Sequence, residues 1–97
     1  MSMPAPTPRI ALIHALQGSL PPIAKAFAED WPEAQTLNIL DDSLSADRAA
    51  QGYLSEQMKH RFQTLTDYAV DNGAHAILFT CSAFHEAIGM AAAKHQL

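Results

Sequence analysis

Apolar residues form three short continuous runs along the chain, and more polar segments separate them. The runs cover residues 9–16, 36–40 and 74–80, and proline, glycine or aspartate residues lie at their borders. Continuous apolar runs of this length are typical of strands that are covered on both faces, as in a parallel sheet. The pattern therefore predicts three strands with helices between them.

The segment after the first run has the features of a helix. Ser19 can cap this helix, which accepts Pro21 and Pro22 in its first turn and stops near Trp31. Four apolar residues share one face of it: Ile23, Ala24, Phe27 and Ala28.

The clearest helical stripe follows the second run. A polar stretch at residues 43–52 leads into a long helix, whose apolar positions are three or four residues apart: Leu54, Met58, Phe62, Leu65 and Ala69. We expect this stripe to be core, and Gly73 to end the helix in a left-handed conformation. After the third strand, residues 84–94 are expected to form a last, alanine-rich helix.

Alternation of strands and helices predicts an α/β fold with a parallel sheet between two layers of helices. Right-handed crossovers allow a one-way strand order, or a reversal that places the third strand beside the first. We predict the reversed order, 2-1-3, in a flavodoxin-like arrangement. Residues 14–19 would then face residues 80–84 across a crevice at the C-terminal ends of the strands, where such folds bind ligands.

Length and composition limit the chain to one small domain. It has 97 residues, of which 48% are hydrophobic, enough for a modest core. We interpret residues 9–97 as a single α/β lobe and the proline-rich residues 1–8 as a disordered tail.

Charge and cysteine content exclude several classes of function. The net charge is −4, and the six lysines and arginines are scattered, so nucleic acid is not an expected partner. A single cysteine forms no internal disulfide, which favours the reducing cytoplasm. We see no apolar run long enough for a membrane span and no signal peptide, so a membrane is not an expected partner either.

Cys81 is the strongest candidate for chemistry. It follows the third apolar run, where a helix is expected to begin, and the unpaired amides and dipole of a helix N-terminus favour a thiolate. The amides of Ser82 and Ala83 would then hold a carboxylate or a developing oxyanion. The simpler interpretations are a buried cysteine that acts only as a small apolar residue, and Ser82 as a helix cap.

Other polar residues are expected near the same edge of the sheet. His14 would lie opposite Cys81, as its base or as a structural residue in a hydrophobic strand. Gln17 and Ser19 flank a glycine turn that can cradle a carboxylate, and one of the two aspartates that end the second strand would bind a ligand while the other caps the next segment. We predict no metal site, because His85-Glu86 lacks the second histidine of the helical zinc motif.

Three segments resemble the first half of proteins in the aspartate/glutamate racemase superfamily, near its hydantoin racemase and arylmalonate decarboxylase branches. They are residues 9–14 (RIALIH), 41–44 (DDSL) and 77–84 (ILFTCSAF), and the strand that ends in Cys-Ser-Ala is the most specific of them. The resemblance implies a cofactor-independent racemase with two similar α/β lobes. Each lobe commonly offers a cysteine to one face of the substrate α-carbon, so that one thiolate removes a proton and the other thiol returns one.

By this resemblance, Cys81 is the acid/base of the N-terminal lobe, and Ser82 and Ala83 hold the carboxylate of a small, amino-acid-like substrate. Further substrate-binding positions form the walls of the site: His14, Gln17, Ser19, Asp42 and Ser43. Proton exchange at carbon needs an acid and a base on opposite faces, so we expect activity to require a second lobe or a homo-oligomer.

Two alternatives to the racemase interpretation stay open at this point. The second hypothesis is that the chain is a truncated lobe without catalytic activity that serves as a binding or interaction module. A weaker alternative is a hydrolase in which His14 activates Cys81 as a nucleophile.

Overall fold

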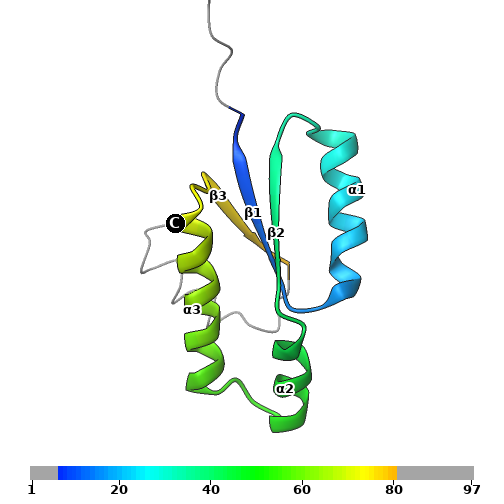
Figure 1. Ribbon diagram of the computed structural model, residues 1–97. Helices are drawn as coiled ribbons and strands as arrows, with labels where there is room; N and C mark the ends of the chain where they lie inside the picture. The colour runs from blue at the N-terminus through cyan, green and yellow to red at the C-terminus, as the bar shows by residue number, and fades with distance from the viewer. Residues whose placement is uncertain (1–6, 81–97) are drawn as a thin grey trace, which may run out of the picture.

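The sheet has three parallel strands in the order β2-β1-β3, which confirms the predicted α/β fold and strand order (Figure 1). The computed structural model describes residues 7–80. Along the chain the elements are β1 (Arg9–His14), a 3-10 turn (Gln17–Ser19), α1 (Leu20–Asp30), β2 (Gln35–Leu40), α2 (Ser43–Gln51), α3 (Glu56–Asp71) and β3 (Ala76–Phe79). The helix expected at residues 84–94 and most of the expected N-terminal tail lie outside the described residues.

The central strand β1 pairs along its length with both neighbours. Leu12 lies between Asn38 of β2 and Leu78 of β3, so these three residues share one face of the sheet. Ile13 lies between Ile39 and Phe79 on the other face. The chain runs from β1 outward to β2 and then crosses β1 to reach β3, so the topological switch point lies between β1 and β3, as predicted.

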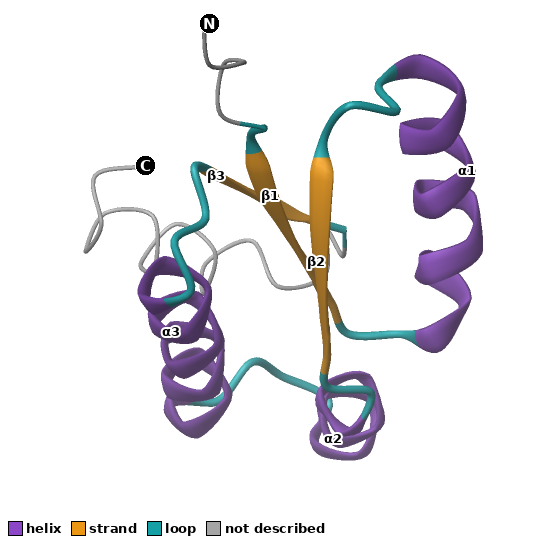
Figure 2. Cartoon of the chain, turned by 45° about the horizontal axis from the view of Figure 1, so that its top comes forward, coloured by secondary structure: helices purple, strands orange, loops and turns teal. Residues whose placement is uncertain are grey.

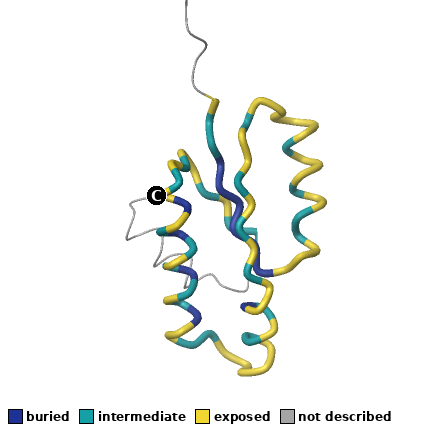
Figure 3. Tube along the Cα trace, in the orientation of Figure 1, coloured by how far each residue is buried: buried dark blue, intermediate teal, exposed yellow. Residues whose placement is uncertain are grey.

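The main core lies between the sheet and α3. It consists of buried Ile13, Ala15, Leu44, Met58 and Phe62, with half-buried Leu54, Leu65, Ile39, Ile77 and Phe79 packed around them. The rings of Phe62 and Phe79 are 6.4 Å apart between centroids. The predicted stripe of the long helix is therefore confirmed as core, and Figure 3 shows buried positions along β1 and one side of α3.

The region after β2 differs from the sequence-based expectation. Residues 43–51 form a separate helix, α2, rather than a polar lead into α3. Gly52 ends α2 with φ +78°, a left-handed conformation that favours glycine, and Ser55 then caps α3 by accepting a hydrogen bond from the Met58 amide. Gly73 ends α3 with the same φ of +78°, as predicted.

Helices α1 and α3 lie on opposite sides of the sheet, and α2 lies beyond the C-terminal end of β2 (Figure 2). Helix α1 spans the expected range but has no fully buried residue. Ser19 precedes it, yet its side chain makes no capping hydrogen bond. Among residues 7–80, no helix combines the length and the apolar content needed to cross a membrane.

Candidate functional site

The C-terminal ends of the three strands are tied together by backbone hydrogen bonds. The Asp41 amide donates to the His14 carbonyl at 3.1 Å, and the Thr80 amide donates to the Ile13 carbonyl at 3.1 Å. The segments that follow β1, β2 and β3 therefore start from one edge, where parallel α/β sheets bind ligands. This edge is the candidate site.

His14 is fully buried at this edge and joins all three strands. Its Nδ1 lies 2.9 Å from the Thr80 hydroxyl, and its Nε2 lies 3.0 Å from Oδ1 of Asn38. The Asn38 carbonyl oxygen only accepts hydrogen bonds, so an imidazole with its proton on Nε2 satisfies both contacts, with Nδ1 accepting from Thr80. We call these three residues the His14 bridge.

The His14 bridge changes the role expected for the histidine. The structure brings His14 to the residue that precedes Cys81, as the predicted crevice requires, but both ring nitrogens are already in hydrogen bonds. The imidazole is hydrogen-bonded at both nitrogens and is closed to solvent. Its role is therefore to position the strand ends, not to contact a substrate. To accept a proton from a thiol, it would first have to break its bond to Thr80.

Asn38 was not among the residues singled out from the sequence. Its signal is present, because it is the polar residue between Leu37 and Ile39 in an apolar strand. Only the register shows that it lies beside Leu12 and on the His14 side of the sheet. A polar side chain inside an apolar strand needs a hydrogen-bond partner, and the histidine of the neighbouring strand is a suitable one.

Two of the predicted wall residues meet at the edge. The side-chain amide of Gln17 donates to Oδ2 of Asp42 at 2.8 Å, and both residues are exposed. The pair connects the turn after β1 with the start of α2, so a polar wall faces solvent beside the strand ends. Ser19 lies one step further, at the end of the 3-10 turn, where its amide donates to the Leu16 carbonyl.

Ser43 belongs to a second polar cluster, which also contains Asp41, Asp47 and Arg61. Asp41 Oδ1 accepts from the amide and the hydroxyl of Ser43, and Asp41 Oδ2 accepts from Arg61 at 3.1 Å. The other terminal nitrogen of Arg61 donates to Asp47 at 2.7 Å. Asp41 thus binds the first residue of α2, whereas Asp42, at the N-cap position of that helix, makes no side-chain capping hydrogen bond. The Ser43 hydroxyl is held between Asp41 and Arg61.

The contacts in this cluster shift the pKa values of Asp41 and Arg61. Partial burial acts to raise the pKa of Asp41, but hydrogen bonds from Ser43 and Arg61, together with the charge of Arg61, outweigh it and hold this pKa below its ordinary value. The hydrogen bond to Asp47 contributes most to raising the pKa of Arg61. Arg61 could not be singled out from the sequence, because it contacts residues 14 and 20 positions away.

Cys81, Ser82 and Ala83 lie outside the described residues. Thr80, which immediately precedes Cys81, is the last residue described, and its amide and hydroxyl are both engaged at the edge. Within residues 7–80, no group of three histidine, cysteine, aspartate or glutamate side chains is arranged to hold a metal ion.

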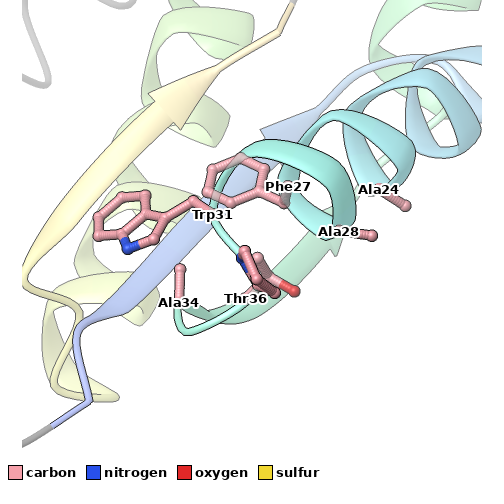
Figure 4. A pocket seen from close by; sticks show the side chains of 7 residues that line it. Ala24, Phe27, Ala28, Trp31, Ala34 and Thr36 are labelled. Carbon is pink, nitrogen blue, oxygen red and sulfur yellow. The ribbon is translucent and has the colours of Figure 1, made fainter.

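A hollow elsewhere on the surface lies between α1 and the start of β2 (Figure 4). It has a volume of about 180 Å³ and is lined by Ala24, Phe27, Ala28, Trp31, Pro32, Ala34 and Thr36. Because Thr36 is near the N-terminal end of β2, this hollow is at the opposite end of the sheet from the candidate site.

Comparisons with known proteins do not add a family to this description. No family model matches the chain, and neither a curated protein nor a solved structure matches it. The functional argument therefore depends on the site itself.

Proposed function

We propose that the chain is one lobe of a cofactor-independent racemase that transfers a proton at the α-carbon of a small carboxylate, with Cys81 as the acid/base. The contact between His14 and Thr80 is the observation that supports this most. It brings the end of β3 against the end of β1, so the chain reaches Cys81 from the edge at which parallel α/β sheets generally bind ligands, which supports the proposal.

In this proposal Cys81 removes the α-proton of the substrate. Its thiolate takes the α-proton and becomes a thiol, while the electron pair of the broken C–H bond moves into the substrate carboxylate. Amides of Ser82 and Ala83 would stabilise the charge that develops there. A second acid must return a proton from the opposite face, so a second lobe or a partner copy completes the reaction.

Gln17 and Asp42 form the wall of this site in the proposal. Their hydrogen bond orients the Asp42 carboxylate without neutralising it, because a side-chain amide carries no charge. A negative wall favours the ammonium or N–H group of an amino-acid-like substrate over a second carboxylate.

Isotope exchange tests the proposal. Wild-type protein is incubated in deuterated water with aspartate, glutamate and hydantoins, and α-deuterium incorporation is followed by NMR. We expect exchange in the wild type and in Thr64→Ala, a control whose hydroxyl donates within its own helix to the His60 carbonyl. Cys81→Ala should abolish it. Exchange at the Cys81 face needs no second lobe, because the thiol that has taken the α-proton exchanges it with solvent and can return deuterium to the same face. Absence of exchange in the wild type, or undiminished exchange in Cys81→Ala, therefore contradicts the proposal.

A non-catalytic binding module is the second candidate. The observation that favours it is α1, whose residues all remain at least partly exposed in spite of an apolar stripe. Alkylation by iodoacetamide across pH separates the candidates, because an apparent thiol pKa near ~8.5, the unperturbed value, indicates a cysteine without activation. The hydrolase alternative has weaker support, because the bonds to Asn38 and Thr80 occupy both nitrogens of His14.

A further inference from the structure

Strand β2 is one of the two outer strands of the sheet formed by residues 7–80. The amides of Gln35 and Asp41 donate to carbonyls of the β1 segment, and the backbone groups of successive residues along a strand point to alternate edges. Every second residue between these two therefore also bonds to β1. The remaining amides and carbonyls point away from β1, and none of them has a hydrogen-bond partner among the described residues. We call these groups the β2 edge; they belong to three exposed residues, Thr36, Asn38 and Leu40.

The β2 edge lacks the features that keep outer strands from pairing with other chains. Such features are charged side chains, proline, β-bulges or a covering element. The sequence of β2, QTLNIL, contains no charge and no proline, and its pairing with β1 runs without a bulge from Gln35 to Leu40. Figure 1 shows α1 and α3 on either side of β2, and neither helix crosses its outer edge. An outer strand of this kind favours pairing with another strand.

A second copy of β2 in antiparallel orientation satisfies the whole β2 edge in one register. A two-fold axis at Asn38 places this residue opposite its own copy and Thr36 opposite Leu40. Residues that face each other as a hydrogen-bonded pair exchange two N–H···O bonds. Every amide and carbonyl of the β2 edge then has a partner, whereas a shift of the register leaves those at one end unpaired. The symmetry of the edge about Asn38 therefore fits a second copy of this chain.

The side chains beside the backbone are compatible with this register. On the α3 side of the sheet, half-buried Leu37 comes to lie opposite Ile39 of the second copy, at a position where cross-strand side chains are close. Gln35 comes to lie opposite Asp41 of the second copy, so the pairing sets no two like charges against each other. An apolar contact therefore adds to the backbone hydrogen bonds, and no charge repulsion opposes them.

We propose that β2 pairs in antiparallel orientation with β2 of a second copy of this chain, about a two-fold axis at Asn38, so that the two sheets become one continuous sheet. The C-terminal ends of the two β2 strands then point in opposite directions, and the two candidate sites lie at opposite ends of the joined sheet. This contact therefore does not supply the second acid of the proposed reaction. It is independent of any catalytic role of Cys81.

Two substitutions of Thr36 in the full-length chain form a matched pair. Thr36→Pro removes the outward amide but none of the bonds to β1, and proline is accepted where a strand amide faces away from the sheet. Thr36→Val also removes the hydroxyl but keeps the amide. The symmetry removes two hydrogen bonds from each Thr36→Pro dimer, and each bond typically contributes about two- to tenfold in affinity. In sedimentation equilibrium, Thr36→Pro should raise the dissociation constant of the dimer about tenfold or more, and Thr36→Val less than about twofold. Equal responses overturn the proposal.

Measurements on the unmodified chain keep the test decisive if circular dichroism shows that Thr36→Pro fails to fold. In the dimer, the amides of the β2 edge should exchange slowly with deuterated water. In a mixture of labelled and unlabelled chains, a nuclear Overhauser contact should join the α-protons of Leu37 in one copy and Ile39 in the other. A dimer without slow exchange or without this contact uses another surface and overturns the proposal. A monomer in sedimentation overturns it as well, because slow exchange in a monomer means that the chain itself covers the edge.

Discussion

Replacing Thr80 by valine tests the His14 bridge with the least change of shape. Valine has nearly the same volume and the same branched Cβ, and it preserves the backbone bond from the residue 80 amide to the Ile13 carbonyl. It removes only the hydroxyl that lies 2.9 Å from Nδ1 of His14. The same hydroxyl also lies 3.4 Å from the Ile13 carbonyl, so the substitution removes this longer contact together with one hydrogen bond of a buried histidine.

The expected loss of stability follows from burial. A buried group left without its hydrogen-bond partner costs about 1–3 kcal/mol, and His14 is 0% exposed, so water cannot replace the hydroxyl. The additional methyl group offsets up to about 0.8 kcal/mol of this loss. We expect the free energy of unfolding to fall by about 1–2 kcal/mol, a large fraction of the roughly 5–15 kcal/mol typical of small domains.

Urea unfolding measures this difference, and a double-mutant cycle assigns it to the bridge. With a slope of about 1 kcal/mol per molar urea, the midpoint should fall by about 1–2 M in Thr80→Val. In a His14→Phe background the same substitution should cost less than about 0.5 kcal/mol, because no ring nitrogen is left to lose a partner. Equal costs in the two backgrounds would refute the reasoning.

Two further substitutions test the polar cluster and the end of α3. Arg61→Met should lower stability at neutral pH by about 1 kcal/mol, the upper range for partly exposed ion pairs. Because its pKa is lowered in the folded state, Asp41 stabilises the fold above the ordinary carboxyl pKa of about 3.9. This stabilisation is lost as the pH falls through the lower pKa of the folded state. In acid titrations, the stability of Arg61→Met should therefore decline less steeply below about pH 4 than that of the wild type. Gly73→Ala should cost about 1–2 kcal/mol in thermal or urea unfolding, because φ there is +78°. Gly18→Ala is its control, since an added Cβ meets no atom within 4 Å and φ needs no glycine; similar losses at both glycines would contradict the argument.

The predicted helices show where sequence patterns were sufficient and where they were not. The positions from Met58 to Ala69 identified the face of α3 that packs on the sheet, because residues three or four apart lie on one side of a helix. Leu54, expected in the same helix, packs on the core from the loop that precedes α3. The separate helix α2 was not predicted, because residues 43–52 are polar and only Leu44 anchors them in the core. Their helical state depends on tertiary contacts, namely Leu44 in the core and Arg61 of α3 with Ser43 and Asp47, and on the left-handed Gly52.

For the candidate site, too, the sequence indicated one part and not another: its location, but not the contacts of its side chains. Its place at the strand ends followed from the alternation of elements and the handedness of crossovers, and the contact of His14 with Thr80 agrees with it. The roles of individual side chains did not follow. Ser43 was expected in a substrate wall, and its hydroxyl is held by Asp41 and Arg61. Arg61 is far from Ser43 in the sequence, so the sequence did not indicate this contact.

The sequence by itself determined the strands, the long helix and the parallel sheet; it left two strand orders possible, and the structure has the reversed order that was predicted. The elements and the parallel sheet depend on local periodicity and on the chirality of the chain, both of which are present in any short window of residues. The tertiary structure alone decided which polar groups face one another: Asn38 with His14, Gln17 with Asp42, and Arg61 with Asp41. Hydrogen bonds act over about 3 Å, so only the register of the strands and the packing of the helices determine which of these partners meet.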